Sequence, residues 1–263
     1  TAHKYPRDMS RFLKSAIDMV KMDEEIAESC IYSRPVGKKK DGEGRYMKDA
    51  KGNFIQEYAT GKSVRLAEIV ASRYGNFRVG SFIVEMTDRF VKARGYAHDL
   101  ESNFAATSEV IESTVTSKGY PYTERMRVVT AKKVLSVALR DATFKVIPGA
   151  LCKPIENAAR SIIAGDGTAE TVARRRMKAL TWCRTLGIDL ARVYAAMGVG
   201  GEADLGTDQL IQLTGIKTTI KDGEITVDEA FPELLPEGTR TRDAAADIFT
   251  GGTTAQKPAT ETK

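Results

Sequence analysis

The fold is decided by residues 77–116, FRVGSFIVEMTDRFVKARGYAHDLESNFAATSEVIESTVT, where the hydrophobic pattern has a period of two residues. Along the second run, large or polar residues alternate with small apolar ones: Phe90, Lys92, Arg94, Tyr96 and His98 against Val91, Ala93 and Ala97. Alternation of this kind puts successive side chains on opposite faces of a strand. Short turns separate three such runs, which are rich in β-branched and aromatic residues. We therefore predict a three-stranded antiparallel meander that can expose one face.

Residues 124–147, ERMRVVTAKKVLSVALRDATFKVI, follow the meander and change to a helical period. Seven apolar residues at helical spacing predict the buried side of a long helix: Val128, Ala131, Leu135, Ala138, Leu139, Ala142 and Val146. Four basic residues are expected away from that side: Arg125, Lys132, Lys133 and Arg140. Pro148 and Gly149 end the helix. The fold class is thus α+β, with an antiparallel β-meander packed on a long helix.

Four parts are expected along the chain. Residues 1–60 hold N-terminal helices and a lysine-rich loop, 61–165 the meander and long helix, 169–232 a small all-α module, and 233–263 a disordered tail rich in proline, glycine and threonine. The segment 37–53 is read as a mobile insertion that carries Lys38, Lys39 and Lys40. It is either a solvated loop or a flexible arm that touches phosphates.

Gly61-Lys62-Ser63 matches the last three residues of a phosphate-binding loop. Such a loop also needs a glycine five positions before Gly61, so that its N–H groups can surround the phosphates, and a buried strand before it. Gln56 occupies that position, and the preceding run is polar and lysine-rich, which is typical of a loop. We therefore interpret Gly61-Lys62-Ser63 as the entrance of a helix, with Ser63 as its N-cap, and do not expect ATP hydrolysis.

Composition narrows the possible functions. The 263 residues are 42% hydrophobic and 29% charged, with a net charge of +5, which is compatible with a polyanionic partner. Three dispersed cysteines and two histidines are hard to assemble into a zinc site or a histidine-based triad. No apolar run is long enough to span a membrane, and no signal peptide is evident, so a cytoplasmic protein without a membrane partner is expected.

The order helix, meander and long basic helix resembles the core of the single-strand annealing proteins of phage recombination. That group includes RecT, Redβ and Erf and shares a fold with the eukaryotic annealing protein of double-strand break repair. The resemblance rests on GKSVRLAEIVASRYGNFRVG (61–80), RGYAHDLESN (94–103) and TAKKVLSVALRDATFKVIPGAL (130–151), and it covers about residues 60–165.

The resemblance implies ATP-independent binding of single-stranded DNA and annealing of complementary strands, by a ring or filament of identical subunits in the host cytoplasm. Annealing breaks no covalent bond, so neither enzymatic activity nor a cofactor is expected. The host single-strand binding protein and a phage exonuclease are further candidate partners. Arg174, Arg175, Arg176 and Lys178, at the start of the helical module, suggest a second DNA contact or a docking site for one of them.

Backbone contacts must dominate such binding, because base readout would defeat sequence-independent pairing. The candidate DNA-binding cations are Lys62, Arg89, Lys92, Arg94, Arg125, Arg127, Lys132, Lys133 and Arg140. Tyr120 and Tyr122, in the turn before the long helix, are the candidates for stacking on bases.

Three alternatives stay open. The basic helix face can be an ordinary solvated surface, and the chain can be an oligomeric scaffolding protein of a phage. A nuclease would instead need a Mg²⁺ site, for which Glu85, Asp88, Asp99 and Glu101 are the candidate carboxylates.

Overall fold

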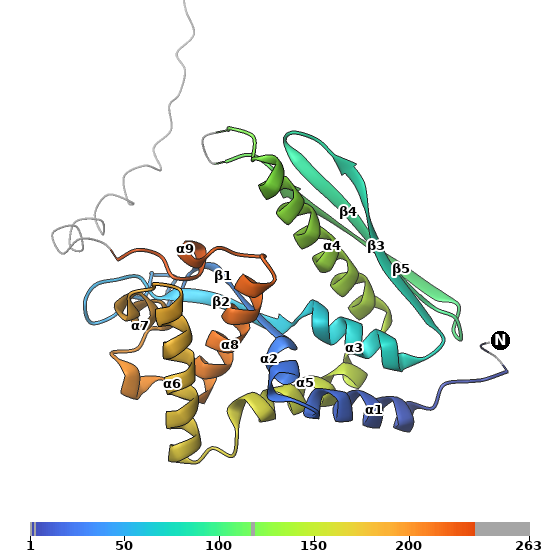
Figure 1. The fold of residues 1–263 in the computed structure, drawn as a ribbon, viewed down its shortest axis with the longest axis horizontal. Coiled ribbons are helices and arrows are strands. Elements are labelled where there is room, and N and C mark those ends of the chain that lie inside the picture. The colour runs from blue at the N-terminus through green and yellow to red at the C-terminus, as the bar shows by residue number, and fades with distance from the viewer. Residues whose placement is uncertain (1, 3, 117–118, 235–263) are drawn as a thin grey trace, which may run out of the picture.

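The computed structural model describes residues 2, 4–116 and 119–234 (Figure 1). Its helices are α1 (Met9–Lys21), α2 (Glu24–Ser29), α3 (Val64–Tyr74), α4 (Glu124–Val146), α5 (Gly149–Ala164), α6 (Ala169–Thr185), α7 (Leu190–Met197), the short 3-10 helix η1 (Glu202–Asp204), α8 (Thr207–Lys221) and α9 (Val227–Ala230). Its strands are β1 (Ile31–Lys38), β2 (Gln56–Lys62), β3 (Phe77–Met86), β4 (Phe90–Asp99) and β5 (Phe104–Ser113). The α+β class is as predicted.

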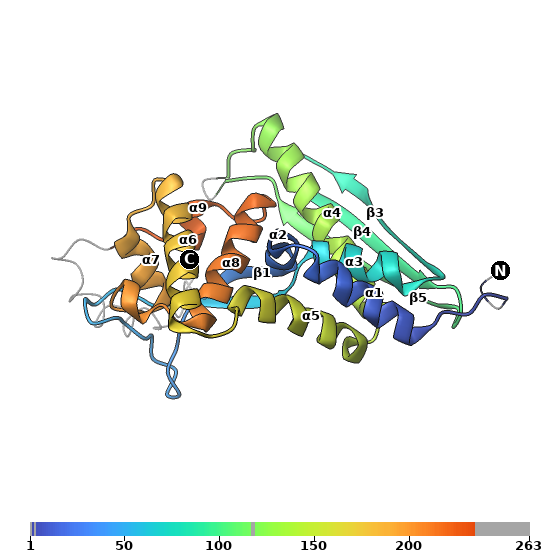
Figure 2. The ribbon, with the colours of Figure 1, turned by 60° about the horizontal axis from the view of Figure 1, so that its bottom comes forward.

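The predicted meander is confirmed as the antiparallel sheet β3-β4-β5. Val91, Ala93 and Ala97 of β4 are fully buried, and residues at alternating positions lie on the other face. The predicted long helix is confirmed as α4, which crosses the buried face of the sheet, while no helix of the described residues covers the opposite face (Figures 1 and 2). The sheet is therefore open on one side, as its alternating pattern indicates.

Gly95 sets how closely α4 approaches the sheet. A Cβ atom at this position would lie 2.0 Å from the carbonyl oxygen of Ala138, which no real contact allows. The helix backbone can reach the centre of β4 only because glycine has no side chain. Val91, Ala93, Val134 and Ala138 form the small core around this crossing.

A second hairpin, β1–β2, is the main difference from the predicted fold. Residues 31–38 and 56–62 pair antiparallel, with a register shift between Pro35 and Gly37. The sequence predicted no strand in either segment, because proline, glycine and lysine interrupt any clean alternation. Helix α8 covers the hairpin, and Gly215 allows close contact, since a Cβ there would lie 2.8 Å from the backbone of Tyr32.

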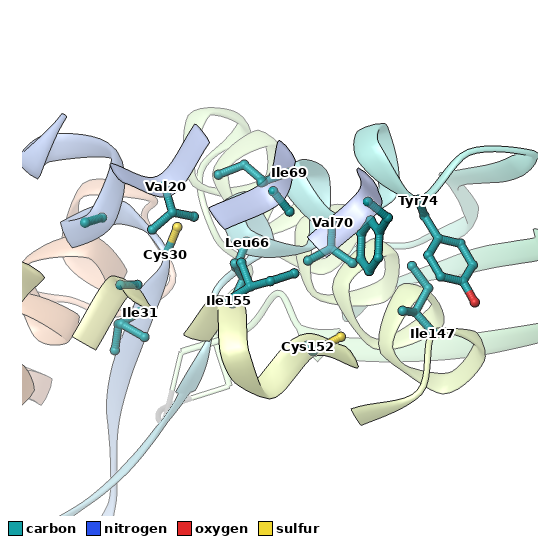
Figure 3. Close-up of a cluster of buried hydrophobic side chains, with 14 of the residues drawn as sticks. Val20, Cys30, Ile31, Leu66, Ile69, Val70, Tyr74, Ile147, Cys152 and Ile155 are labelled. Carbon is teal, nitrogen blue, oxygen red and sulfur yellow. The ribbon is translucent and has the colours of Figure 1, made fainter. Parts of the chain in front are cut away.

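The largest hydrophobic core joins α1, α2, α3 and α5 to the start of β1 (Figure 3). Val20, Leu66, Val70 and Ile155 are fully buried in it, so the first helix packs against α3 and α5. A separate core in the helical module contains Leu180, Leu213 and Phe231 among others. Helices α6, α7, α8 and α9 thus pack around their own interior.

Helix α2 connects these two parts through charge. The carboxylate of Glu28 accepts hydrogen bonds from the Nζ atoms of Lys178 and Lys217, at 2.7 and 2.8 Å. Burial alone would raise the pKa of Glu28, but the two ammonium groups outweigh this effect and lower it. The hydroxyl of Thr218 also donates to the Glu28 carbonyl. α2 is therefore fixed to both α6 and α8.

The predicted tail, residues 233–263, lies outside the described residues except for Glu233 and Leu234. Among the described helices, none has the length and apolar character needed to cross a bilayer.

Candidate nucleic-acid interface

Five of the predicted site residues come together at one end of the meander, which we call the tip: Arg89, Tyr120, Tyr122, Arg125 and Arg127. The turn between β3 and β4, the loop after β5 and the start of α4 meet there (Figure 1). Thr114 donates its N–H to the Arg89 carbonyl at 2.9 Å, and Tyr122 donates to the Thr114 carbonyl at 2.7 Å. The first of these bonds joins residues 25 positions apart in the chain, and the second joins residues 8 positions apart.

Side chains at the tip are open to solvent. Tyr120 is 68% exposed, and Arg89 and Arg125 are exposed without an ion-pair partner among the described residues. Arg127 donates to the carboxylate of Asp88 at 3.0 Å, which ties the first turn of α4 to the β3–β4 turn. Apolar side chains also reach the surface here: Met86, Met126 and Val128. Val128 was predicted on the buried side of the helix and instead is 47% exposed, because the sheet ends before this turn of α4.

Lys92 and Arg94 lie on the open face of the sheet, as the alternation in β4 predicts. Both contact Glu109 of β5, at 2.7 Å from the Lys92 Nζ and 2.9 Å from the Arg94 Nε. Hydrogen bonds from these two residues lower the pKa of Glu109. One carboxylate thus partly neutralises two of the predicted DNA-binding cations. The surrounding exposed apolar residues are Phe82, Tyr96 and Ile111.

Along α4 the predicted cations have different environments. Lys132 is exposed, and Lys133 donates to Glu112 of β5 at 3.0 Å. The prediction that Arg140 lies away from the buried side of the helix is wrong, because its side chain is buried: the guanidinium lies 4.8 Å from the ring centre of Tyr32 and contacts Asp141. The β1–β2 hairpin, which the sequence pattern does not predict, contacts this part of α4.

Lys62 ends β2 and lies over the ring of Phe144 in α4, with its Nζ 4.0 Å from the ring centre. Ser63 alone separates β2 from α3, and its hydroxyl accepts a hydrogen bond from the Leu66 N–H, which confirms the predicted N-cap. Gly61-Lys62-Ser63 therefore joins a strand directly to a helix, and Lys62 and Arg140 both attach the hairpin to α4.

The four carboxylates considered for a Mg²⁺ site lie at opposite ends of β4. Asp88 precedes this strand and pairs with Arg127, whereas Asp99 ends it. Ten strand residues span about 30 Å, so the two pairs cannot share one ion. Asp99 and Glu101 instead bind Arg7, whose guanidinium also lies 3.8 Å from the Tyr74 ring centre. Among the described residues no group of three His, Cys, Asp or Glu is arranged to hold a metal ion.

Most of the predicted insertion, residues 37–53, lies in a hydrogen-bonded extension of the β1–β2 hairpin, which we call the knob (residues 38–56; Figure 2). Backbone hydrogen bonds join Lys39 to Ile55, Ile55 to Met47, and Met47 to Lys39. The aromatic residues Tyr46 and Phe54 lie among its lysines. A tandem repeat in the sequence, KDGEGRY (40–46) and KDAKGNF (48–54), would have revealed this structure.

Most basic residues at the start of α6 have structural contacts. Arg175 and Lys178 contact Glu24 of α2, and the Arg176 guanidinium donates to the Leu205 carbonyl at 2.9 Å. Arg174 is exposed.

Comparison with known proteins found no matching family model, no matching curated protein and no matching solved structure.

Proposed function

We propose that this protein binds single-stranded DNA and anneals complementary strands without ATP, as an oligomer in the cytoplasm of a phage-infected cell. The observation that carries the proposal is the tip, where the exposed Arg89 and Arg125 lie at the same end of the meander as Tyr120, which is 68% exposed, while Tyr122 is half-buried. Cations next to exposed aromatic rings are the side chains that grip a single strand, through phosphate contacts and base stacking. The resemblance to annealing proteins rests on the same order of helix, meander and long basic helix.

Annealing needs a strand to be held by its backbone while its bases stay accessible. Among the described residues, no carboxylate pairs with Arg89 or Arg125, so both supply free charge for phosphates. Tyr120 offers a ring to a base, and such a stack is worth about 1–3 kcal/mol. None of these contacts depends on base identity, so any complementary strand can pair with the one that is held.

The outer strands of the meander offer edges through which identical subunits can pair. Its strand order is β3-β4-β5, and within the described residues no other strand pairs with the outer edges of β3 and β5. Unpaired strand edges are templates for pairing with another chain. One tip holds few nucleotides, and repetition along a strand converts weak unit affinity into strong total binding. A host single-strand binding protein and a phage exonuclease remain proposed partners.

Binding of a fluorescent 30-nucleotide oligonucleotide, measured by anisotropy, tests the role of the tip. The variant Arg89→Gln/Arg125→Gln/Lys132→Gln removes two cations of the tip and the exposed Lys132 further along α4. It should bind at least about tenfold more weakly at low salt, because three phosphate contacts are lost. The control Lys14→Gln/Lys21→Gln/Lys153→Gln removes the same charge from exposed sites on α1 and α5 and should bind almost like the wild type. Equal affinities for both variants would contradict the assignment of the tip.

A further inference from the structure

The knob consists of two copies of one small structure. In each copy an aspartate, Asp41 or Asp49, accepts hydrogen bonds from two backbone N–H groups of the turn that follows it. A glycine with φ of +82°, Gly44 or Gly52, closes each turn. These glycines adopt the left-handed conformation that favours glycine, so both turns have a fixed shape.

Each copy also places a lysine over the aromatic ring six residues later. The Nζ of Lys40 lies 5.1 Å from the ring centre of Tyr46, and the Nζ of Lys48 lies 4.7 Å from that of Phe54. Lys38 continues the pattern from β1, with its Nζ 3.7 Å from the Phe54 ring centre. The two rings pack edge to face, 5.9 Å apart. Three ammonium groups are thereby gathered around one pair of aromatic rings.

The partners of these lysines leave their charge in place. A carboxylate would neutralise an ammonium group, whereas an aromatic ring orients it and keeps its full charge. The acidic side chains of the knob are used elsewhere, since Asp41 and Glu43 contact Arg45 and Asp49 binds the turn backbone and Asn53. Lys38, Lys40 and Lys48 have no carboxylate partner among the described residues, unlike Lys92, Arg94 and Lys133 of the meander and α4.

We propose that the knob is a second binding surface for a single-stranded nucleic acid, and that Lys38, Lys40 and Lys48 contact its phosphates. The choice of partner rests on the proposed function, whereas the surface itself is separate from the tip. In both views the knob projects from the hairpin beside α7, away from the tip (Figures 1 and 2). Each subunit would then hold a strand at two places, which allows two stretches of nucleic acid to be brought together.

The test is a salt titration of the affinity for a fluorescent 30-nucleotide oligo(dT). In the variant Lys38→Gln/Lys40→Gln/Lys48→Gln, the slope of log affinity against log salt should fall by about 2, because each single-strand phosphate contact contributes about 0.7. Lys14→Gln/Lys21→Gln/Lys153→Gln has the same net charge and should keep the wild-type slope. Lys38→Arg/Lys40→Arg/Lys48→Arg should also keep it, and this variant separates loss of charge from loss of the knob's structure.

An unchanged slope in the glutamine variant, or an equal fall in the control, would overturn the proposal. So would loss of heparin binding with unchanged oligonucleotide binding, because the partner would then be another polyanion. Oligo(dT) and oligo(U) titrations report whether the strand is DNA or RNA, and a reduced slope with either supports the surface. If the slope falls but the wild type does not anneal strands, the knob proposal stands and the proposed function fails. If annealing occurs and the slope is unchanged, the proposed function stands and the knob proposal fails.

Discussion

At Gly95 the packing of α4 on the sheet leaves no room for a methyl group. A Cβ atom there would lie 2.0 Å from the Ala138 carbonyl oxygen, so Gly95→Ala must push the helix off the strand. We expect the variant to lose about 2–3 kcal/mol of unfolding free energy, the usual cost of overpacking a core. Urea denaturation followed by circular dichroism measures this loss.

Gly42→Ala is the matched control for that substitution. Gly42 has no heavy atom within 4 Å of the added carbon, so its urea midpoint should stay close to that of the wild type. A Gly95→Ala protein as stable as the Gly42→Ala protein would mean that α4 does not cross the sheet at this distance.

Protonation of Asp99 should lower the unfolding free energy of the protein in acid. Burial would raise its pKa, but hydrogen bonds from Arg7, from the Glu101 N–H and from the Ser102 hydroxyl outweigh this and lower it to about 2. Because the pKa in the folded state lies below that of an unfolded aspartate, near 3.9, the carboxylate stabilises the fold above about pH 4. That contribution, about 1–2 kcal/mol, is lost as the pH falls from about 4 to 2.

The variant Asp99→Asn tests this assignment. It should be less stable than the wild type at pH 7, and its unfolding free energy should depend less on pH between about 4 and 2. Asp18→Asn, at an exposed position of α1, should behave like the wild type. If Asp99→Asn and wild type lose stability in parallel over this pH range, Arg7 does not hold Asp99 as an ion.

Among the elements, those with a clean hydrophobic period were predictable. The alternation in β4 located the meander, and the helical spacing after Glu124 located α4 to within one residue. The β1–β2 hairpin was missed, because Pro35 and Gly37 interrupt β1 and tertiary contact with α8 stabilises strands whose local pattern is weak. The burial of Arg140 follows from that hairpin, so sequence alone could not reveal it.

The candidate site was predictable only in part for the same reason. Periodicity placed Lys92 and Arg94 on the open face, but Glu109 reached both of them from the neighbouring strand, through a register that the sequence does not specify. The gathering of Arg89, Tyr120 and Arg125 at the tip depends on turns that bring three segments together.

Glu28 joins α2 to α6 and α8, and its charge should therefore matter for stability. Glu28→Gln removes the charge that faces both Lys178 and Lys217, and we expect it to cost about 2 kcal/mol of unfolding free energy. Glu25→Gln, on the same helix, breaks only an exposed pair with Lys221 and should cost less than about 0.5 kcal/mol. Thermal unfolding compares the two, and equal losses would show that the Glu28 contacts do not join these elements.

Over the whole molecule, the exposed cations form two separate surfaces and not one continuous basic face. Beyond its first turn, the long helix offers only Lys132 as an exposed predicted cation, since Lys133 is paired and Arg140 is buried. Exposed cations gather instead at two places: the tip, at one end of the meander, and the knob, at the end of the β1–β2 hairpin (Figure 1). A molecule built in this way can hold nucleic acid without enclosing it, and repetition in an oligomer would extend the path.

The most direct measurement mixes the purified protein, without ATP, with two complementary oligonucleotides that carry a fluorophore and a quencher. We expect the quenching to be much faster with the protein than without it, and slower at high salt than at low salt. The variant Arg89→Gln/Arg125→Gln/Lys132→Gln should quench more slowly than the wild type, whereas Lys14→Gln/Lys21→Gln/Lys153→Gln should match it. Quenching no faster than the protein-free rate, together with no binding to single strands at low salt, would contradict the proposed function.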